Sequence, residues 1–167
     1  MTVYIGIDLA KKADYTALVA LNDDGNVLNI ARLSHIDYKD QLKQIDLFVR
    51  GYSDCIIFVD ATGPGAAVYE MIKDINNTAV SITITAGNNA KKINKFEYNV
   101  SKKFLMKGLQ TAFIKTWLQI DCYGSEALKK ECVNFIRKDN GKLEAGTGHD
   151  DLVLALALAL LGKVLIN

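Results

Sequence analysis

Acidic side chains stand at three points of the chain where apolar sequence gives way to a turn or to the start of a helix. Asp8 and Asp60 each end a short apolar run, and Asp150 and Asp151 precede a long one. A carboxylate beside buried apolar sequence needs compensation for its desolvation. A divalent cation is the usual compensation where several carboxylates converge, so the three points predict one metal site that folding assembles. Such a site is typical of enzymes that cleave phosphodiester bonds.

The positions of the four aspartates predict different roles. Two Mg²⁺ or Mn²⁺ ions ~4 Å apart can activate an attacking water and stabilise the leaving oxygen, with one carboxylate between them and others outside. Asp8, in the middle of the expected sheet, is the natural bridging ligand, and Asp60 and Asp151 are outer ligands. Structural alternatives stay open, because Asp8 and Asp60 could cap the turns that follow them. Of Asp150 and Asp151, we expect one to cap a helix and the other to point into the site.

His149 stands directly before the two aspartates. It could bind a metal, transfer a proton or contact the leaving group. A histidine in this place more often contacts a metal ligand without binding the metal itself, or lies on a surface loop. This is the interpretation that we favour.

A basic stretch separates the second acidic point from the third. Residues 88–107 contain six lysines against one acid, Glu97. Alone, this pattern favours a solvated loop and helix face, but beside an acidic metal site it predicts contacts to a phosphate backbone. The lysines are Lys91, Lys92, Lys95, Lys102, Lys103 and Lys107, and we take all but the last as candidate DNA contacts.

Composition limits the class of protein. The chain has 167 residues, half of them hydrophobic, with one proline and a formal net charge of +1, which is ordinary for one globular domain over residues 1–167. The three cysteines lack metal-binding spacing, so neither a disulfide framework nor a zinc site is expected. The N-terminus does not resemble a signal peptide. The apolar run 152–161 is shorter than the ~20 residues of a membrane-spanning helix, so we expect a buried helix and no membrane partner.

Hydrophobic periodicity predicts alternating elements after an initial meander. The expected strands are 3–7, 16–21, 27–33, 54–59 and 80–85, and the expected helices are 39–52, 65–75, 100–110, 124–135 and 150–166, with a weaker one at 116–120. An antiparallel meander followed by alternating helices and strands predicts an α/β fold with a mixed five-stranded sheet flanked by helices. This is the ribonuclease H-like arrangement, in which acids from the first strand, the fourth strand and a late helix meet at one edge of the sheet.

The quoted motifs resemble one known family. GIDLA at 6–10, DYTAL at 14–18, VDATGPG at 59–65, SKK at 101–103 and GHDDLVLALA at 148–157 occur in the order and spacing of the C-terminal nuclease domain of tailed-phage large terminase subunits. The resemblance spans almost the whole chain, and the last motif is its most specific part.

The resemblance implies an endonuclease that cuts concatemeric viral DNA during genome packaging, in the cytoplasm of the host cell. It places the metal ligands at Asp8, Asp60 and one or both of Asp150 and Asp151. It also implies a packaging ATPase domain, a small terminase subunit and a portal as partners. The ATPase is not part of this sequence, so we expect either an excised domain or a stand-alone protein.

Other functions stay open at this stage. A RuvC-like Holliday junction resolvase shares the fold and the acids. A non-catalytic nucleic-acid-binding module would have the same architecture. A nucleotide-binding domain of the actin or sugar-kinase type opens similarly, but it needs a second half and phosphate loops that 167 residues do not hold.

Overall fold

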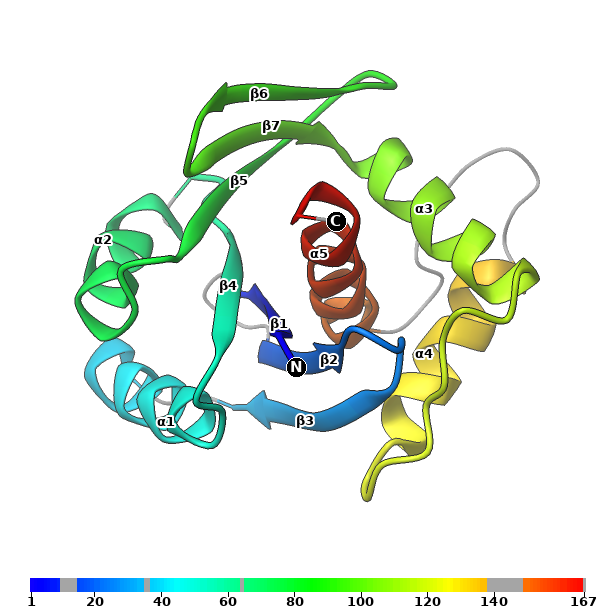
Figure 1. Ribbon diagram of the computed structural model, residues 1–167, viewed down its shortest axis with the longest axis horizontal. Helices are drawn as coiled ribbons and strands as arrows, with labels where there is room; N and C mark the ends of the chain where they lie inside the picture. The colour runs from blue at the N-terminus through cyan, green and yellow to red at the C-terminus, as the bar shows by residue number, and fades with distance from the viewer. Residues whose placement is uncertain (10–14, 35–36, 64, 138–148, 167) are drawn as a thin grey trace.

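The computed structural model describes residues 1–9, 15–34, 37–63, 65–137 and 149–166, whose strands form one sheet with helices on both faces (Figure 1). The sheet has seven strands in the order β3-β2-β1-β4-β5-β7-β6. The strands are β1 (Val3–Asp8), β2 (Thr16–Asn22), β3 (Val27–Leu33), β4 (Cys55–Asp60), β5 (Val80–Thr85), β6 (Ala90–Asn94) and β7 (Glu97–Ser101). The helices are α1 (Tyr38–Arg50), α2 (Gly65–Ile75), α3 (Lys102–Ile114), α4 (Glu126–Arg137) and α5 (Asp151–Ile166).

The pairing of the strands determines where polar residues can gather. β1, β2 and β3 form the expected antiparallel meander, and β1 also pairs in parallel with β4. β4, β5 and β7 continue the parallel arrangement. Because neighbouring parallel strands end at the same edge, the carboxyl ends of β1, β4, β5 and β7 share one edge of the sheet.

The sheet separates two apolar cores. Val3, Ile5 and Ile7 of β1 pack in the core with α1 and α2, whereas Tyr4 packs in the core with α3, α4 and α5. This alternation follows from the two-residue period of a strand. The apolar sequence of α5 from Leu152 to Leu161 is explained by its position, because this part of the helix is buried between the sheet, α3 and α4 (Figure 1).

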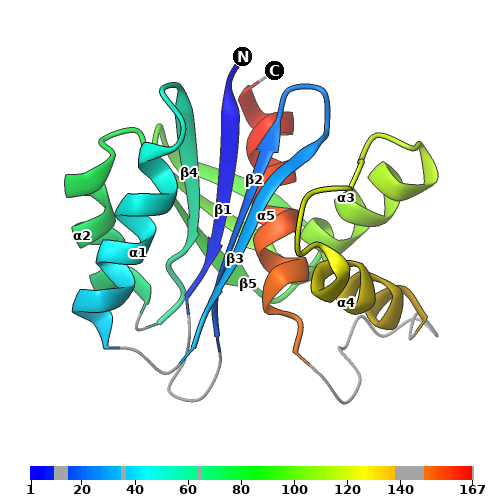
Figure 2. The same ribbon diagram turned by 90° about the horizontal axis from the view of Figure 1, so that it is seen from below.

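α5 lies very close to the strands beneath it. A Cβ atom at Gly6 of β1 would overlap the carbonyl oxygen of Ala155 and come within 2.7 Å of Ala159 N. Similarly, a Cβ at Gly162 would overlap the ring of Phe58 on β4. α5 runs opposite in direction to β1, so its first residues lie at the carboxyl edge of the sheet (Figure 2). Both chain ends lie at the other end of the molecule.

The ribonuclease H-like mixed sheet with flanking helices is confirmed, but the expected number of five strands is wrong. β6 and β7 form a hairpin within the basic stretch, where the sequence indicated only a loop and a helix. The helix expected at 100–110 therefore begins later, at Lys102, with Ser101 as its N-cap, and it continues to Ile114. The cap is direct, because Ser101 Oγ accepts a hydrogen bond of 3.1 Å from Phe104 N.

The weak helix expected at 116–120 is also wrong. Gln119 instead forms a parallel bridge with Asn26, and its backbone N–H and C=O bond Gly25 and Val27. The backbone around Gln119 is therefore extended and pairs with the turn between β2 and β3. The prediction of no membrane-spanning segment is consistent with the described helices, none of which is long and apolar enough to cross a membrane.

Candidate metal centre

The first two acids lie side by side on one face of the sheet. Ile7 of β1 is paired with Val59 of β4, so Asp8 and Asp60 follow as the next residues at the carboxyl edge. Ile7 and Val59 both pack toward α1 and α2. Since side chains alternate along a strand, Asp8 and Asp60 face the opposite side, where α5 lies.

The third acid comes to the same edge from α5. Asp151 is the first residue of this helix and stands four residues before Ala155, whose backbone contacts Gly6. Residues four apart share one face of a helix, so Asp151 lies on the face toward β1, one turn nearer the carboxyl edge. Asp151 is 7% exposed and Asp60 4% exposed, whereas Asp8 is half-buried. The backbone thus places three aspartates, from β1, β4 and α5, at one corner of the sheet.

Asp60 is held by the turn that follows it. Its Oδ1 accepts a hydrogen bond of 2.9 Å from Thr62 N, and Thr62 Oγ1 in turn accepts one of 2.8 Å from Ile84 N. The structural role expected for Asp60, capping its turn, is therefore present. Asp60 Oδ1 accepts the hydrogen bond that caps the turn. The carboxylate can bind a cation at the same time.

Asp150 has a different environment from its neighbour. Its Oδ2 lies 2.9 Å from Lys102 Nζ, in a partly exposed ion pair. Lys102 is the first residue of α3 and follows β7 directly, so the carboxyl edge of the sheet also positions this ammonium group. The geometry separates the two aspartates, with Asp151 toward the other acids and Asp150 toward Lys102.

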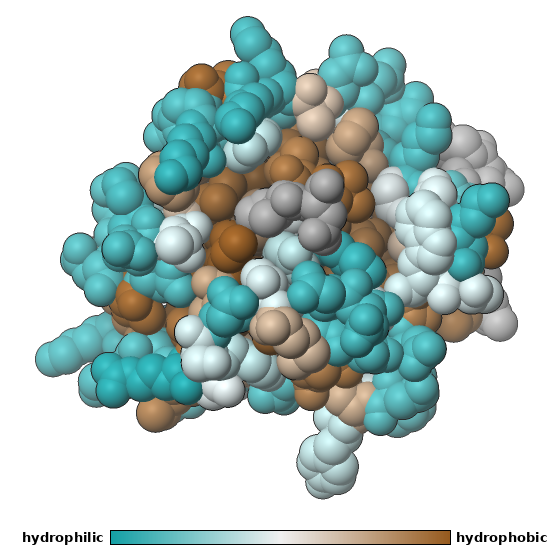
Figure 3. Space-filling view, in the orientation of Figure 1, coloured by the Kyte–Doolittle hydropathy of each residue, from teal (hydrophilic) through white to brown (hydrophobic). Residues whose placement is uncertain are grey.

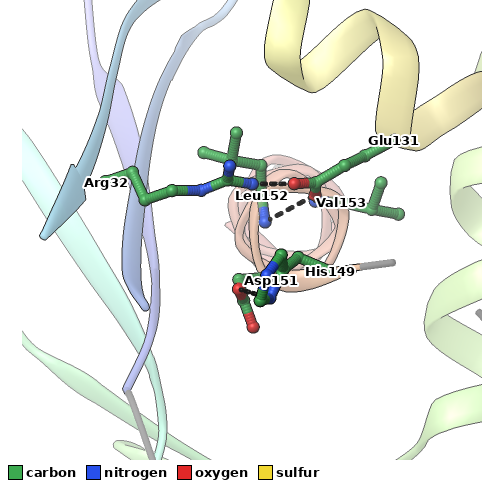
Figure 4. Close-up of polar contacts among 6 residues, drawn as sticks. All are labelled: Arg32, Glu131, His149, Asp151, Leu152 and Val153. Carbon is green, nitrogen blue, oxygen red and sulfur yellow. Dashed lines mark hydrogen bonds and ion pairs between the residues drawn. The ribbon is translucent and has the colours of Figure 1, made fainter. Parts of the chain in front are cut away.

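The cap of α5 comes from another helix, and the expectation that Asp150 or Asp151 supplies it is wrong. Glu131 of α4 accepts hydrogen bonds from the backbone N–H groups of Leu152, at 3.0 Å, and Val153, at 3.4 Å (Figure 4). Glu131 also forms an ion pair with Arg32 of β3. These are the positions that an N-cap side chain normally bonds.

His149 lies beside Asp151, as its position in the sequence suggested. Its Nδ1 is 3.6 Å from Asp151 Oδ2, and its side chain is about half exposed. The ring stands edge-on to Tyr15, with 4.9 Å between the ring centroids. His149 can therefore hold Asp151 from the solvent side or exchange a proton there.

The candidate DNA-binding lysines are distributed along the β6–β7 hairpin and do not gather at one point. Lys102 and Lys103 begin α3 at the carboxyl edge. Lys91 and Lys92 lie on β6, and Lys95 is in the turn at the opposite end of the hairpin. Lys92 and Lys95 lie over the rings of Tyr98 and Phe96, at 5.7 and 5.0 Å. The expected patch is thus a strip that leads away from the acids.

The chemistry of the donors fits a hard divalent cation, since every candidate ligand is a carboxylate oxygen. In the part of the chain that the structure describes, however, no three His, Cys, Asp or Glu side chains stand close enough together to form a finished metal cage. The strand register and the start of α5 thus place the three aspartates at one corner, without a finished set of ligands among the described side chains.

An apolar hollow lies elsewhere. It has a volume of about 630 Å³ and lies between α3 and α5, with Phe104, Trp117, Leu160, Leu161 and Val164 among its lining residues and none of the four aspartates. Figure 3 shows apolar side chains gathered around the C-terminal end of α5. The acids instead stand at the carboxyl edge of the sheet.

The cysteines take no part in this site. All three are free thiols, and burial raises the pKa of each, that of Cys132 to about 12. A metal binds the thiolate and not the thiol, so these side chains are poor ligands.

Comparison with known families identifies the fold. The family described as "Terminase RNaseH-like domain" matches residues 5–163. This chain belongs to that family. The resemblance drawn from the motifs is therefore confirmed over almost the whole terminase domain.

Individual relatives agree with this assignment. The large terminase subunit of Thermus virus P23-45 is 25% identical over 163 residues, and the match covers 93% of this chain but 30% of that protein. The terminase domain therefore spans less than a third of this curated relative.

Solved structures show the same fold. The large terminase nuclease of thermophilic phage G20c with bound cobalt has a TM-score of 0.73 and 22% identity, covering 96% of this chain and 80% of that one. Its magnesium-bound form has a TM-score of 0.72 and 21% identity, with the same coverage. The nuclease domain of the large terminase subunit gp2 of bacterial virus Sf6, solved with manganese and beta-thujaplicinol, has a TM-score of 0.67 and 15% identity, covering 95% and 87%.

Two residues near the acids of this terminase domain were missed in the sequence. Glu131 sits among Leu128, Cys132 and Phe135, the buried face of α4, so a charged residue interrupts an apolar helical stripe. Such an interruption signals a partner across the core. Arg32, near the end of β3, similarly stands between Ala31 and Leu33. Neither signal reveals the other residue of the pair.

Proposed function

We propose that this terminase domain is a metal-dependent endonuclease that hydrolyses the phosphodiester bonds of double-stranded DNA. The observation that carries the proposal is the convergence of Asp8, Asp60 and Asp151 at one corner of the sheet, on the face that α5 covers. Carboxylates from three distant segments would repel one another there without a cation. Two Mg²⁺ or Mn²⁺ ions are the cofactors that suit this donor set.

Each residue has a definite task in this proposal. Asp8, from the central strand, would bind both ions, and Asp60 and Asp151 would each bind one from outside. Bound divalent ions supply an activated water and stabilise the charge on the leaving oxygen. Lys102 holds Asp150 at 2.9 Å, and its partly exposed ammonium can also meet a DNA phosphate. His149, half exposed beside Asp151, is placed to exchange a proton with solvent.

The relatives support the choice of a divalent cation. The G20c nuclease was solved with cobalt and with magnesium, and the Sf6 domain with manganese. We extend divalent metal binding to this chain because its own candidate ligands are all carboxylates.

The lysine strip supports DNA as the substrate. Lys102 and Lys103 stand beside the acids, and Lys91, Lys92 and Lys95 continue along the hairpin away from them. A duplex that enters the acidic corner brings phosphates close to carboxylates. Positive charge nearby would offset the repulsion between these two sets of negative groups. Contacts to phosphates alone would give little sequence preference.

We further propose that the domain works within a DNA-packaging machine, beside a packaging ATPase domain, a small terminase subunit and a portal. The support is its family and its match to 30% of the length of a large terminase subunit from Thermus virus P23-45. The corresponding site of action is the cytoplasm of the infected host cell.

A plasmid assay tests the nuclease proposal. Purified protein is incubated with supercoiled plasmid in EDTA, Mg²⁺ or Mn²⁺, beside Asp8→Asn. We expect metal-dependent nicking and linearisation that Asp8→Asn abolishes, because the bridging ligand loses its charge. Asp46→Asn is the matched control, since Asp46 forms an exposed ion pair with Arg50 on α1, on the other face of the sheet.

Two outcomes would contradict the proposal. Full activity of Asp8→Asn would show that cleavage does not depend on this carboxylate. A linear duplex left intact beside a four-way junction that is cut would instead identify a junction resolvase.

A further inference from the structure

We propose that Arg32 and Glu131 are a positioning pair that holds the first turn of α5, and with it the Asp151 carboxylate, in place for metal binding. This inference rests on the proposed function, because it assumes that Asp151 is a ligand. Glu131 bonds the backbone of α5 and pairs with Arg32, and neither residue is proposed as a metal ligand. They act through the backbone of α5 and through His149 (Figure 4).

The first step is the cap of α5. A helix leaves its first N–H groups without partners inside the helix, and normally the side chain of the preceding residue accepts from them. Here Glu131 Oε2 accepts from Leu152 N at 3.0 Å and from Val153 N at 3.4 Å. These residues directly follow Asp151, so Glu131 ties the backbone that carries the ligand to α4.

The second step is the neutralisation of Glu131. Its side chain is 10% exposed and would be expensive to bury as a lone anion. The Arg32 guanidinium pairs with Glu131 Oε1, and its Nε and Nη2 atoms are buried. Removing one member of such a buried pair leaves an uncompensated charge, which is costly. The cap therefore depends on Arg32, from the far side of the meander.

A third set of contacts connects Arg32 to Asp151 by another route. The guanidinium lies over the ring of Tyr15, 5.0 Å from its centroid. Tyr15 stands edge-on to His149, and His149 Nδ1 is 3.6 Å from Asp151 Oδ2. Arg32 thus borders both the backbone anchor and the side chain beside the ligand.

The pair also explains why the two adjacent aspartates behave differently. Since Glu131 provides the cap, the side chain of Asp150 is available for its ion pair with Lys102. Asp151 keeps the face toward β1. A negative charge at the start of a helix is favourable in itself. Arg32 compensates the charge of Glu131, and Lys102 compensates that of Asp150. The negative charge gathered at this helix end is therefore limited.

Mn²⁺ binding, measured by electron paramagnetic resonance on the intact protein, tests the pair without relying on cleavage. We expect Glu131→Gln and Arg32→Met to weaken Mn²⁺ binding by about 10-fold, the size typical for residues that orient metal ligands. Glu70→Gln is the matched control, because Glu70 forms an exposed ion pair with Lys73 on α2. Its Mn²⁺ affinity should equal that of the wild type.

A double variant separates positioning from simple loss of stability. Replacing a buried ion pair by apolar side chains is often neutral for stability, so Arg32→Met with Glu131→Met should recover melting temperature relative to either single variant. The cap of α5 would still be missing, so we expect Mn²⁺ binding to stay about 10-fold weaker.

The outcomes are distinguishable. If Glu131→Gln binds Mn²⁺ as the wild type does, or if affinity returns together with stability in the double variant, Arg32 and Glu131 are purely structural and the positioning inference is overturned. If the wild type itself binds no Mn²⁺, the metal site of the proposed function fails first, whatever the pair does.

Discussion

Asp150 and Asp151 show how one step along the chain changes the task of a carboxylate. Asp151 is 7% exposed and lies on the side of α5 that faces β1. The Asp150 side chain is 28% exposed and is bound to Lys102 at 2.9 Å. The difference comes from geometry, because Asp150 precedes the helix and Asp151 begins it. Only Asp151 shares its helical face with Ala155, the contact of Gly6.

The two residues should therefore differ when each is changed to asparagine. We expect Asp151→Asn to lower the rate of plasmid cleavage by more than about 100-fold, beyond the range of residues that only orient a ligand, and Asp150→Asn by about 10-fold. Single-turnover cleavage rates measure both. Lys102→Met should reproduce the effect of Asp150→Asn, and the double variant should add little, since the two act as a pair. Equal losses for Asp150→Asn and Asp151→Asn would refute this division of roles.

The residue scale also shows what sequence reasoning could find. The four aspartates stand out because each follows or precedes apolar sequence. Glu131 and Arg32 come from α4 and β3, and their relation to α5 exists only in three dimensions. The sequence suggested that a residue of the aspartate pair caps α5, which is the ordinary local solution. The actual cap comes from another helix, and no local pattern predicts it.

At the scale of elements, the contact between α5 and β1 places the acids relative to one another. Gly6 lets the helix backbone approach the strand, since a Cβ there would overlap the carbonyl oxygen of Ala155. The atoms that it would meet belong to backbone and cannot move aside as a flexible side chain could. The register of α5 on β1, and thus the distance from Asp151 to Asp8, depends on this contact.

Gly6→Ala should destabilise the protein strongly. Overpacking of a core costs ~1–3 kcal/mol, and a clash with backbone belongs at the upper end of that range or beyond it. Gly108→Ala is the control, because an added Cβ at this position of α3 meets nothing within 4 Å. That change should stabilise by ~0.5–1 kcal/mol, as expected for alanine in a helix interior. Urea unfolding monitored by circular dichroism compares the two, and a Gly6→Ala protein as stable as the wild type would contradict the close approach.

The elements that sequence reasoning predicted correctly are those with strong apolar patterns. β1 to β5 and the helices α1, α2, α4 and α5 lie close to their expected ranges. The β6–β7 hairpin was missed because Lys91, Lys92 and Asn94 are poor strand formers with no apolar alternation. β6 is an edge strand, which pairs only with β7, and lysines on an exposed edge discourage pairing with other chains.

Over the whole molecule, the basic residues of the β6–β7 hairpin and of the start of α3 extend from the far turn of the hairpin to the carboxyl edge, where the acids stand. Lys103 starts α3 at the carboxyl edge, and Lys91 lies opposite Asn99 near that end of the hairpin. Lys95 is at the far turn. The net charge of +1 is therefore unevenly distributed, with the strip positive and the rest of the chain net negative.

Charge reversal in the strip should weaken DNA binding and its dependence on salt. We expect Lys91→Glu with Lys103→Glu to lower affinity for a short duplex and to reduce the slope of log affinity against log salt by about 2, because ~0.9 counterions are released per phosphate contact. Lys115→Glu with Lys130→Glu changes net charge equally, at the exposed C-cap residue of α3 and at an exposed position of α4. Fluorescence anisotropy in Ca²⁺, at several salt concentrations, compares them. Equal slopes for the two pairs of substitutions would make the strip an ordinary solvated surface.

The burial of α5 has a consequence for how the protein is made. α5 is the last of the described elements in the chain, yet it fills the core on one face of a sheet whose strands all precede it. A ribosome adds ~5–20 residues each second, so that sheet face waits several seconds for its covering helix. Asp8 and Asp60 emerge early, and Asp151 arrives only with α5. The proposed nuclease site is therefore completed only after α5 has been made, and a chain that has not yet reached α5 carries two of its acids without the third.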